Sequence, residues 1–266
     1  YEIRIQTKDK SENLLSKSFT LNVIDIKNEK TNIISTFDYK NIKDQLKYIN
    51  TVNNKLIFSY RDQLWVTDGK ISTLLKDIKS FYQDITITDG KNKSVILNDK
   101  LYFLVKFGSS HQVWVTDGTS TGTKRVVNLL NIDNGVYDYF LAAIDNPLIE
   151  DDGTLLVSSS GVGSLAIWPT SSYVQLLRFN QNELNKTDLR LKNENVLIRF
   201  EGSGGDYYSN TSHANKKITP YGNTGNFFIF NYNDQLWTTD GTQNSTLKLL
   251  DLGKGEDSVI IKNTQF

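Results

Sequence analysis

Apolar and polar residues alternate with a period of two along much of this chain. The stretches 2–6 and 18–25 alternate in this way, and several short runs after residue 45 do the same. A period of two places successive side chains on opposite faces of a strand, whereas a helix would show a period of about 3.6 residues. The sequence therefore predicts an all-β protein built from many short strands.

The first 30 residues form a unit of their own. The two alternating stretches are joined by the polar segment 7–16, so we predict a long β-hairpin. Because two strands cannot bury a sheet face by themselves, residues 1–30 are expected to be the last two strands of a domain that begins upstream, followed by a linker.

Residues 31–266 carry an eight-residue motif three times. It reads QLWVTDGK at 63–70, QVWVTDGT at 112–119 and QLWTTDGT at 235–242. Each copy lies between an aromatic-rich strand and an apolar strand, and two degenerate units align at 155–179 and 196–219, the first with Trp168 at the Trp position. Self-similarity at a period of about 40 to 50 residues, with several short strands per period, indicates a β-propeller.

We therefore expect residues 31–266 to form a propeller-like domain of four-stranded antiparallel blades, about five to six in number. First strands are predicted at 48–52 and 94–97, whereas the fifth unit leaves only about six residues, 219–224, for its first strand. Residues 258–263 repeat 94–99, so a further unit is expected to begin there, and the ring is expected to close with strands beyond residue 266.

The repeated residues are predicted to be structural. Glycine after aspartate permits positive φ, and the aspartate side chain accepts hydrogen bonds from amides just downstream, so Thr-Asp-Gly is expected to turn between the third and fourth strands. The tryptophan is expected to fill the gap between neighbouring sheets. The residues given these roles are Trp65, Asp68, Gly69, Trp114, Asp117, Gly118, Trp168, Trp237, Asp240 and Gly241.

The motif, together with apolar strands such as 73–78, resembles the bacterial ELWxxDGT repeat family. Gln63, Gln112 and Gln235 stand where that family usually has Glu, a change that we expect a surface hairpin to tolerate. The resemblance implies a propeller-like module of a large secreted or cell-surface protein, often beside adhesion domains, and it implies no catalytic set. Residues 1–30 are similar to the last two strands of a cadherin-like domain, which is an Ig-like sandwich.

Calcium is the only cofactor that these resemblances suggest. Acidic residues at the junctions of cadherin-like domains bind calcium, which makes Asp9, Asp25 and Glu29 the candidate ligands here. Calcium takes about six to eight oxygen ligands, whereas Lys27 and Asn28 reduce the negative charge of this junction. A solvated linker between domains is the alternative interpretation.

The composition excludes several classes of protein. The chain has no cysteine, which removes disulfides, thiolate zinc sites and thiol nucleophiles. Its 30 basic residues balance 30 acidic ones, so no net field attracts nucleic acid, and no apolar run is long enough to span a membrane. His111 and His213 are expected in loops, and no arginine cluster is apparent, so we expect no enzyme.

One loop has a composition that suits ligand binding. Asp206, Tyr207 and Tyr208 follow a glycine-rich stretch, and flat aromatic faces on a loop suit sugar stacking or protein contact. A degenerate blade in which tyrosine has replaced the tryptophan is the alternative interpretation.

The leading functional hypothesis is a non-enzymatic module of a large extracellular or cell-surface protein, serving adhesion, ligand display or surface assembly. Its expected partners are other proteins or surface glycans and the neighbouring domains of a longer chain. The alternative is a carbohydrate-binding or carbohydrate-active propeller, either lectin or glycoside hydrolase, with its site on the central axis. That alternative requires converging carboxylates or aromatic residues at the axis, whereas the adhesion module predicts small and apolar residues there.

Overall fold

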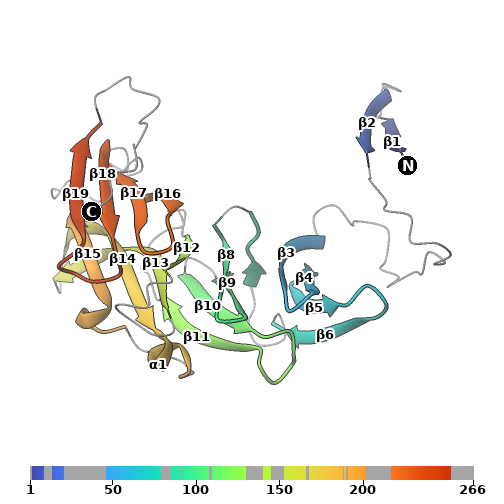
Figure 1. Cartoon of the computed structure of the whole chain (residues 1–266), viewed down its shortest axis with the longest axis horizontal. Coiled ribbons are helices and arrows are strands. Elements are labelled where there is room, and N and C mark those ends of the chain that lie inside the picture. The colour runs from blue at the N-terminus through green and yellow to red at the C-terminus, as the bar shows by residue number, and fades with distance from the viewer. Residues whose placement is uncertain are drawn as a thin grey trace. The chain divides into compact units, whose positions relative to one another are not determined.

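The structure is a computed structural model in which almost all regular secondary structure of the described residues is β-strand (Figure 1). It forms two compact units, residues 1–33 and 34–266. Every pair of named strands is antiparallel, which confirms the all-β prediction. The residues that the structure describes are 2–8, 14–20, 46–78, 85–90, 92–107, 110–129, 140–144, 153–165, 168–187, 189, 191–201 and 217–252.

The first unit contains a hairpin of β1 (Glu2–Lys8) and β2 (Leu14–Thr20). Its register runs from Glu2 opposite Thr20 to Lys8 opposite Leu14. The hairpin is confirmed, but its second strand begins at Leu14 and not at residue 18. A shorter connection costs less loop-closure entropy, which favours pairing that starts immediately after the polar turn.

The first sheet of the second unit is a four-stranded meander. The strand predicted at 48–52 is confirmed as its first strand, and the next three follow in chain order, each hydrogen-bonded to the one before it. The strands are β3 (Leu46–Val52), β4 (Lys55–Tyr60), β5 (Gln63–Thr67) and β6 (Ser72–Asp77).

The second sheet repeats this order with a divided first strand. Two short strands, β7 (Ile85–Ile87) and β8 (Ser94–Leu97), pair with successive parts of β9 (Lys100–Phe107) and share the first position. The sheet is completed by β10 (Ser110–Thr116) and β11 (Lys124–Leu129).

The third sheet corrects the predicted alignment of units. It consists of β12 (Leu141–Ile144), β13 (Thr154–Leu165), β14 (Trp168–Asn180) and β15 (Val196–Glu201). Residues 155–179 of the first degenerate unit and 196–201 of the second therefore contribute to one sheet, and the described part of the second unit holds four sheets where the sequence predicted five units. The prediction was wrong because the stretch 155–179 supplies only two long strands, β13 and β14, and β15 pairs with β14 as the fourth strand of the same sheet.

The fourth sheet returns to the short pattern of the first. The first strand predicted at 219–224 is confirmed as β16 (Thr219–Asn223). It is followed by β17 (Phe228–Tyr232), β18 (Gln235–Thr239) and β19 (Leu247–Asp251). The predicted further unit at 258–263 lies outside the described residues.

Two-residue turns tighten four of the hairpins. At each turn both residues have positive φ, between 49° and 59°, the geometry of a type I′ turn. Asn and Asp tolerate this region better than other residues that carry a side chain, and they fill seven of the eight positions. The turns are Asn53–Asn54, Arg61–Asp62, Asn98–Asp99 and Asn233–Asp234.

The four sheets pack face to face in chain order. This packing is seen in the inner strands, where alternate residues of one strand enter different cores. On β9, Leu101, Phe103 and Val105 pack against the first sheet, whereas Tyr102 and Leu104 pack against the third. A third cluster joins the third and fourth sheets. Each inner sheet is therefore apolar on both faces, as expected for a sheet that lies between two others.

Successive first strands are hydrogen-bonded to one another. The side-chain amide of Asn50 on β3 donates to the Ser94 hydroxyl at the start of β8 at 3.2 Å. The backbone N–H of Leu141 on β12 donates to the Asn92 carbonyl at 2.7 Å, and the Asn223 amide on β16 donates to the Ala143 carbonyl. The four sheets of the second unit thus meet along their first strands.

Candidate functional site

The Thr-Asp-Gly turn of the second sheet is closed by its own side chains. The Asp117 carboxylate accepts hydrogen bonds from the backbone N–H and the hydroxyl of Thr119, at 2.8 and 2.6 Å. The Thr116 hydroxyl accepts from the Gly118 N–H at 3.0 Å and lies 2.7 Å from the hydroxyl of Thr123, a buried pair. Gly118 has a φ of 87°, which only glycine adopts readily.

The other two copies fold in the same way. Asp68 accepts from the backbone N–H groups of Lys70 and Ile71 at 2.9 and 3.1 Å. Asp240 accepts from the N–H and hydroxyl of Thr242, both at 2.8 Å, and also from the Ser245 hydroxyl. All three turns connect the third strand of a sheet to the fourth, as the sequence predicts. The three carboxylates therefore lie in three different sheets and each serves its own turn.

Hydrogen bonds to the ionised form keep two of these carboxylates acidic. Backbone N–H donation from Lys70 and then Ile71 holds the pKa of Asp68 below its usual range. For Asp117, burial acts to raise the pKa, but donation from the hydroxyl and backbone of Thr119 outweighs burial and the pKa is lowered. Low pKa values suit a permanent turn acceptor and oppose a role as general acid near neutral pH.

The repeated tryptophans occupy different interfaces. Trp114 is only 5% exposed and packs in the core between the first and second sheets. Trp237 packs against the core between the third and fourth sheets, with its ring edge-on to Phe200 at 5.1 Å. Trp65 alternates along β5 with Leu64 and Val66, which face the second sheet, so it lies on the opposite face of the first sheet. The three indoles form no common pocket.

Trp168 does not occupy the predicted position. The sequence alignment placed Leu165 and Trp168 in one strand, but Leu165 ends β13 and Trp168 begins β14, and the two residues pair across the hairpin. The structure describes the backbone of Trp168 and not its side chain. The apolar stretch around Trp168 suggested that this residue is equivalent to the tryptophan of the motif, and the hairpin register contradicts that alignment.

The glutamines of the motif have specific partners. Gln63 donates to the Asp77 carboxylate at 3.2 Å, and Gln235 donates to Asp251 at 2.9 Å, each across a strand pair. Gln112 is 1% exposed, so the expectation of a surface position is wrong for this copy. A glutamate at 63 or 235 would place two like charges opposite each other, which explains why these hairpins carry the neutral amide.

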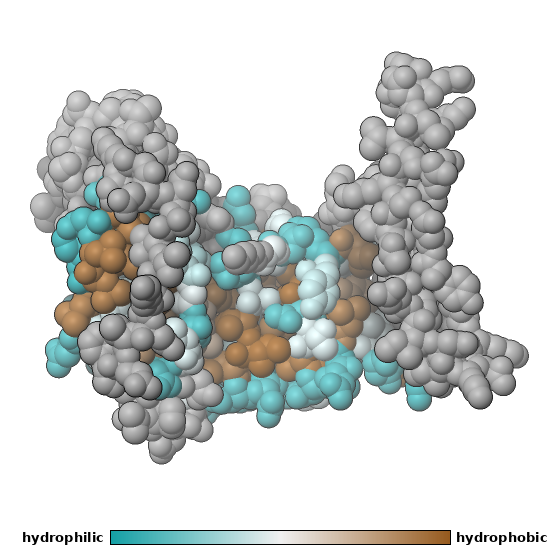
Figure 2. Space-filling model, turned by 45° about the horizontal axis from the view of Figure 1, so that its top comes forward, coloured by the Kyte–Doolittle hydropathy of each residue, from teal (hydrophilic) through white to brown (hydrophobic). Residues whose placement is uncertain are grey.

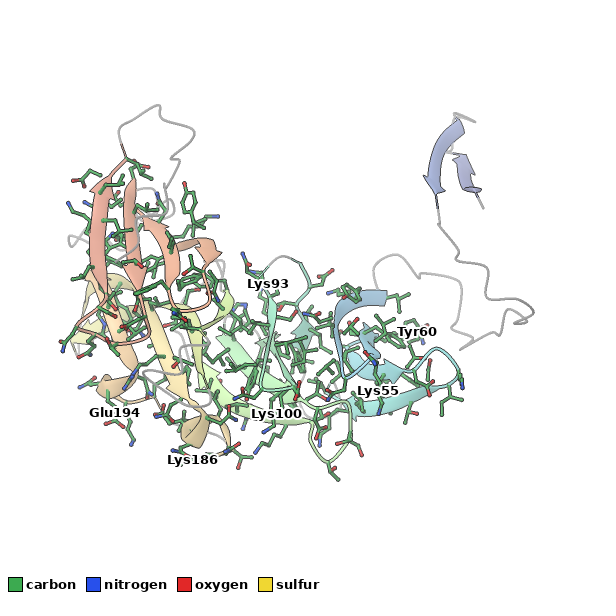
Figure 3. All side chains as sticks on the ribbon, viewed as in Figure 1. Lys55, Tyr60, Lys93, Lys100, Lys186 and Glu194 are labelled. Atoms are coloured by element: carbon green, nitrogen blue, oxygen red, sulfur yellow. The ribbon has the colours of Figure 1, made fainter. Side chains whose placement is uncertain are left out.

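Two of the three Asp-Gly turns also contact the neighbouring sheet. A Cβ on Gly118 would lie 3.6 Å from Lys55 of the first sheet, and one on Gly241 would lie 3.5 Å from Thr154 of the third. Each turn therefore packs against the loop between the first two strands of the preceding sheet. In Figure 3 the Lys55 and Lys100 side chains, from the first and second sheets, lie along the same side of the array. The sequence showed the turn but gave no signal for this contact.

The remaining candidates divide into residues with structural partners and residues that the structure does not describe. His111 was expected in a loop, but it lies in β10 and is 8% exposed. The guanidinium of Arg178 donates to the Gly241 carbonyl at 3.3 Å, and Arg199 lies 4.4 Å from the Tyr173 ring centre. The candidates outside the described residues are Asp9, Asp25, Glu29, Asp206, Tyr207, Tyr208 and His213.

The described residues show neither a metal-binding cluster nor a membrane-spanning helix. They contain no group of three or more His, Cys, Asp or Glu side chains placed to hold a metal ion. They also contain no helix with the length and apolar character needed to cross a membrane.

Comparisons with known proteins identify no relative. No family model matches the chain, no curated protein matches it, and no solved structure matches it. The resemblances to the ELWxxDGT repeat and to cadherin-like domains therefore stay predictions from the sequence.

Proposed function

We propose that the four sheets are blades of a β-propeller of about five to six blades, in a non-enzymatic module of a large secreted or cell-surface protein. Adhesion, ligand display or surface assembly is its role. The meeting of successive first strands supports the propeller, because blades that share an axis approach most closely at their first strands.

The residues of the first strands carry the functional part of the proposal. In a propeller these strands form the wall of the axis, and here none of the residues in β3, β7, β8, β12 and β16 is Asp or Glu. They are mostly small or apolar, as in Leu-Ala-Ala-Ile of β12. Hydrolysis of a glycoside needs two carboxyl groups about 5 to 10 Å apart, and these strands provide none.

The repeated residues support the same conclusion. The Asp and Thr side chains of the three turns are engaged within their own turns, and Trp114 is buried between sheets. Because the repeated residues are structural, a binding partner is expected to contact the connecting loops. The sequence of these loops can vary without destabilising the blades.

Binding of the purified chain to arrayed glycans and to immobilised matrix proteins tests the proposal, with heat-unfolded chain as the control. Saturable binding by the folded chain alone, with no turnover of glycoside substrates, is the expected result. Glycoside turnover that a single substitution abolishes would contradict it.

Carbohydrate binding without hydrolysis is the second candidate, and one side chain favours it. Tyr221 on the first strand of the fourth sheet is 62% exposed, and an exposed aromatic ring on an axis strand suits stacking on a sugar. Tyr221→Ala would then weaken glycan binding at least about tenfold, which corresponds to about 1.4 kcal/mol, while Tyr221→Phe would retain it. Equal binding by both variants would remove this candidate.

A further inference from the structure

The strand register reveals a fourth copy of the repeated glutamine. In the three sheets that carry the motif, the pairing of the third and fourth strands shifts by one residue immediately before the tryptophan, and the glutamine lies two residues before it. The third sheet has the same shift between Leu176 and Leu177, so Gln175 is the equivalent glutamine. A bulge at the same place in each sheet indicates an equivalent structural unit. The third sheet thus retains the glutamine, with leucine in place of the tryptophan.

The residue opposite this glutamine reverses its charge in the third sheet. It is Asp77 in the first sheet, Asn128 in the second, Asp251 in the fourth and Arg199 in the third. The two aspartates accept a hydrogen bond from the glutamine amide, which an arginine cannot do because it has no acceptor. The glutamine of the third sheet must therefore accept instead of donate on this side.

Gln175 holds the arginine through a buried hydrogen-bond relay. Its Nε2 donates to the Ser159 hydroxyl at 2.9 Å, and its Oε1 accepts from Nε of Arg199 at 3.0 Å. Gln175 and Ser159 are 5% and 3% exposed, so water competes little for these bonds, whereas Arg199 itself is exposed. Because Nε is bonded to the relay, the N–H groups of both Nη atoms are left for another partner.

An aromatic ring supports the same guanidinium. Cζ of Arg199 lies over the Tyr173 ring, 4.4 Å from its centre. Tyr173 is two residues before Gln175 on β14, so the two side chains share a face of the sheet. The cation–π contact positions the charge without neutralising it. Arg199 has no ion pair with any carboxylate whose side chain the structure describes, so a fixed cation without such a counter-ion is available to an anion.

The surroundings of Arg199 indicate the kind of anion. The chain has equal numbers of basic and acidic residues, so no broad positive field favours a polyanion such as nucleic acid. Figure 2 shows hydrophilic residues beside hydrophobic ones at the left of the molecule, the side on which Figure 1 places the third sheet. The Tyr173 ring carries a hydroxyl, which both donates and accepts hydrogen bonds. A ligand that combines one carboxylate with neighbouring hydroxyl groups matches these features, and a uronic acid is such a ligand.

We propose that Arg199 binds the carboxylate of a uronic acid in an acidic glycan, and that the Tyr173 hydroxyl binds a hydroxyl of the same sugar. The two Nη atoms donate parallel hydrogen bonds to the carboxylate oxygens. Gln175 is a positioning residue, because it acts through Arg199. This inference rests on the proposed display function, and it places the ligand on two strands of the third sheet in addition to the loop contacts of that function.

Isothermal titration calorimetry of the 266-residue chain with an oligogalacturonate tests the site. The native chain is expected to bind saturably, and the methyl ester of the same oligosaccharide, which lacks the charges, is expected not to bind. Arg199→Met should lower the affinity at least about tenfold, and Tyr173→Phe, which keeps the ring, about threefold. Lys70→Met is the matched control, because it removes one positive charge from an exposed residue of the first sheet, and its affinity should stay within about twofold of native.

Gln175→Glu separates a role in positioning from a role in folding. The substitution keeps the shape of the side chain but places a carboxylate opposite Arg199, so the guanidinium is paired within the chain. Oligogalacturonate binding should fall at least about tenfold while the far-UV circular dichroism stays native. Native affinity in a folded Gln175→Glu chain would contradict the assignment of Gln175.

Two results would overturn the site itself. They are the absence of oligogalacturonate binding by the native chain, and equal affinities of the native chain and a folded Arg199→Met variant. Binding of poly-L-glutamate as tightly as oligogalacturonate would assign the site to acidic peptides and overturn the assignment to glycans. A chain that binds neutral glycans or matrix proteins but not oligogalacturonate would overturn only this inference and leave the adhesion proposal standing.

Discussion

The indole Nε1 of Trp114 donates a hydrogen bond of 3.0 Å to Oε1 of Gln112, two residues earlier on the same face of β10. Both residues are buried between the first and second sheets. In the other two copies of the motif the glutamine amide donates to an aspartate across the strand pair, and the residue opposite Gln112 is Asn128. Where the residue opposite the glutamine is not an aspartate, the glutamine thus accepts the hydrogen bond of the buried indole N–H.

Gln112→Met tests this relationship. The substitution keeps much of the volume but leaves a buried indole N–H without an acceptor, which costs about 1 to 3 kcal/mol of unfolding free energy. Gln235→Met is the matched control, because the Gln235–Asp251 bond is exposed, and we expect its effect to stay within about 0.5 kcal/mol. Urea denaturation followed by tryptophan fluorescence measures both, and equal effects would contradict the assignment.

Trp114→Ala and Trp65→Ala compare a buried tryptophan with a partly buried one. Removing Trp114 creates a cavity in the core between two sheets, and we expect a loss of about 3 to 5 kcal/mol. Trp65 is only partly buried, so its removal is expected to cost less than the removal of Trp114. Thermal unfolding at low protein concentration provides the measurement, and a larger loss at Trp65 would refute the comparison.

Gly122 is restricted by the turn carboxylate and not by its own backbone. A Cβ at this position would clash with the Asp117 carboxylate, so Gly122→Val is expected to break the turn and to destabilise the chain by more than about 1 kcal/mol. The fourth sheet has Ser245 here, and its hydroxyl donates to Asp240. We therefore expect Gly122→Ser to be tolerated much better than Gly122→Val in the same denaturation assay.

The lowered pKa values of Asp68 and Asp117 predict acid sensitivity of their turns. A carboxyl group whose pKa is lower in the folded chain contributes stability above its unfolded pKa, which is ordinarily 3.8. That contribution disappears as the pH falls through the folded pKa. We expect stability to decrease from about pH 5 to about pH 2, and to decrease less in the Asp68→Asn/Asp117→Asn variant, because asparagine keeps an acceptor oxygen that does not titrate.

Denaturation midpoints of the native chain and the double variant at several pH values measure this difference. Parallel pH profiles would show that these two carboxylates do not contribute to it.

Strong local signals made parts of the fold predictable. Alternation identified the strands at 48–52 and 94–97, and Asp-Gly with its threonines identified three turns that the structure closes with side-chain hydrogen bonds. The alignment failed at 155–201, where two predicted units contribute the strands β13, β14 and β15 to one sheet. Local patterns cannot show how strands are divided among sheets, because the strands of one sheet and those of two sheets alternate with the same period.

The sequence by itself determined that the chain forms strands and where its repeated turns lie, because turn geometry and side-chain alternation depend on residues close together in the chain. Only the tertiary structure decided which of two equally apolar faces of a strand meets which neighbour. It also decided that Gln112 is buried while Gln235 is only partly buried, and which apolar residues of each strand enter which of the three cores. Those outcomes depend on packing between residues far apart in sequence, and the spacing of residues along the chain does not predict that packing.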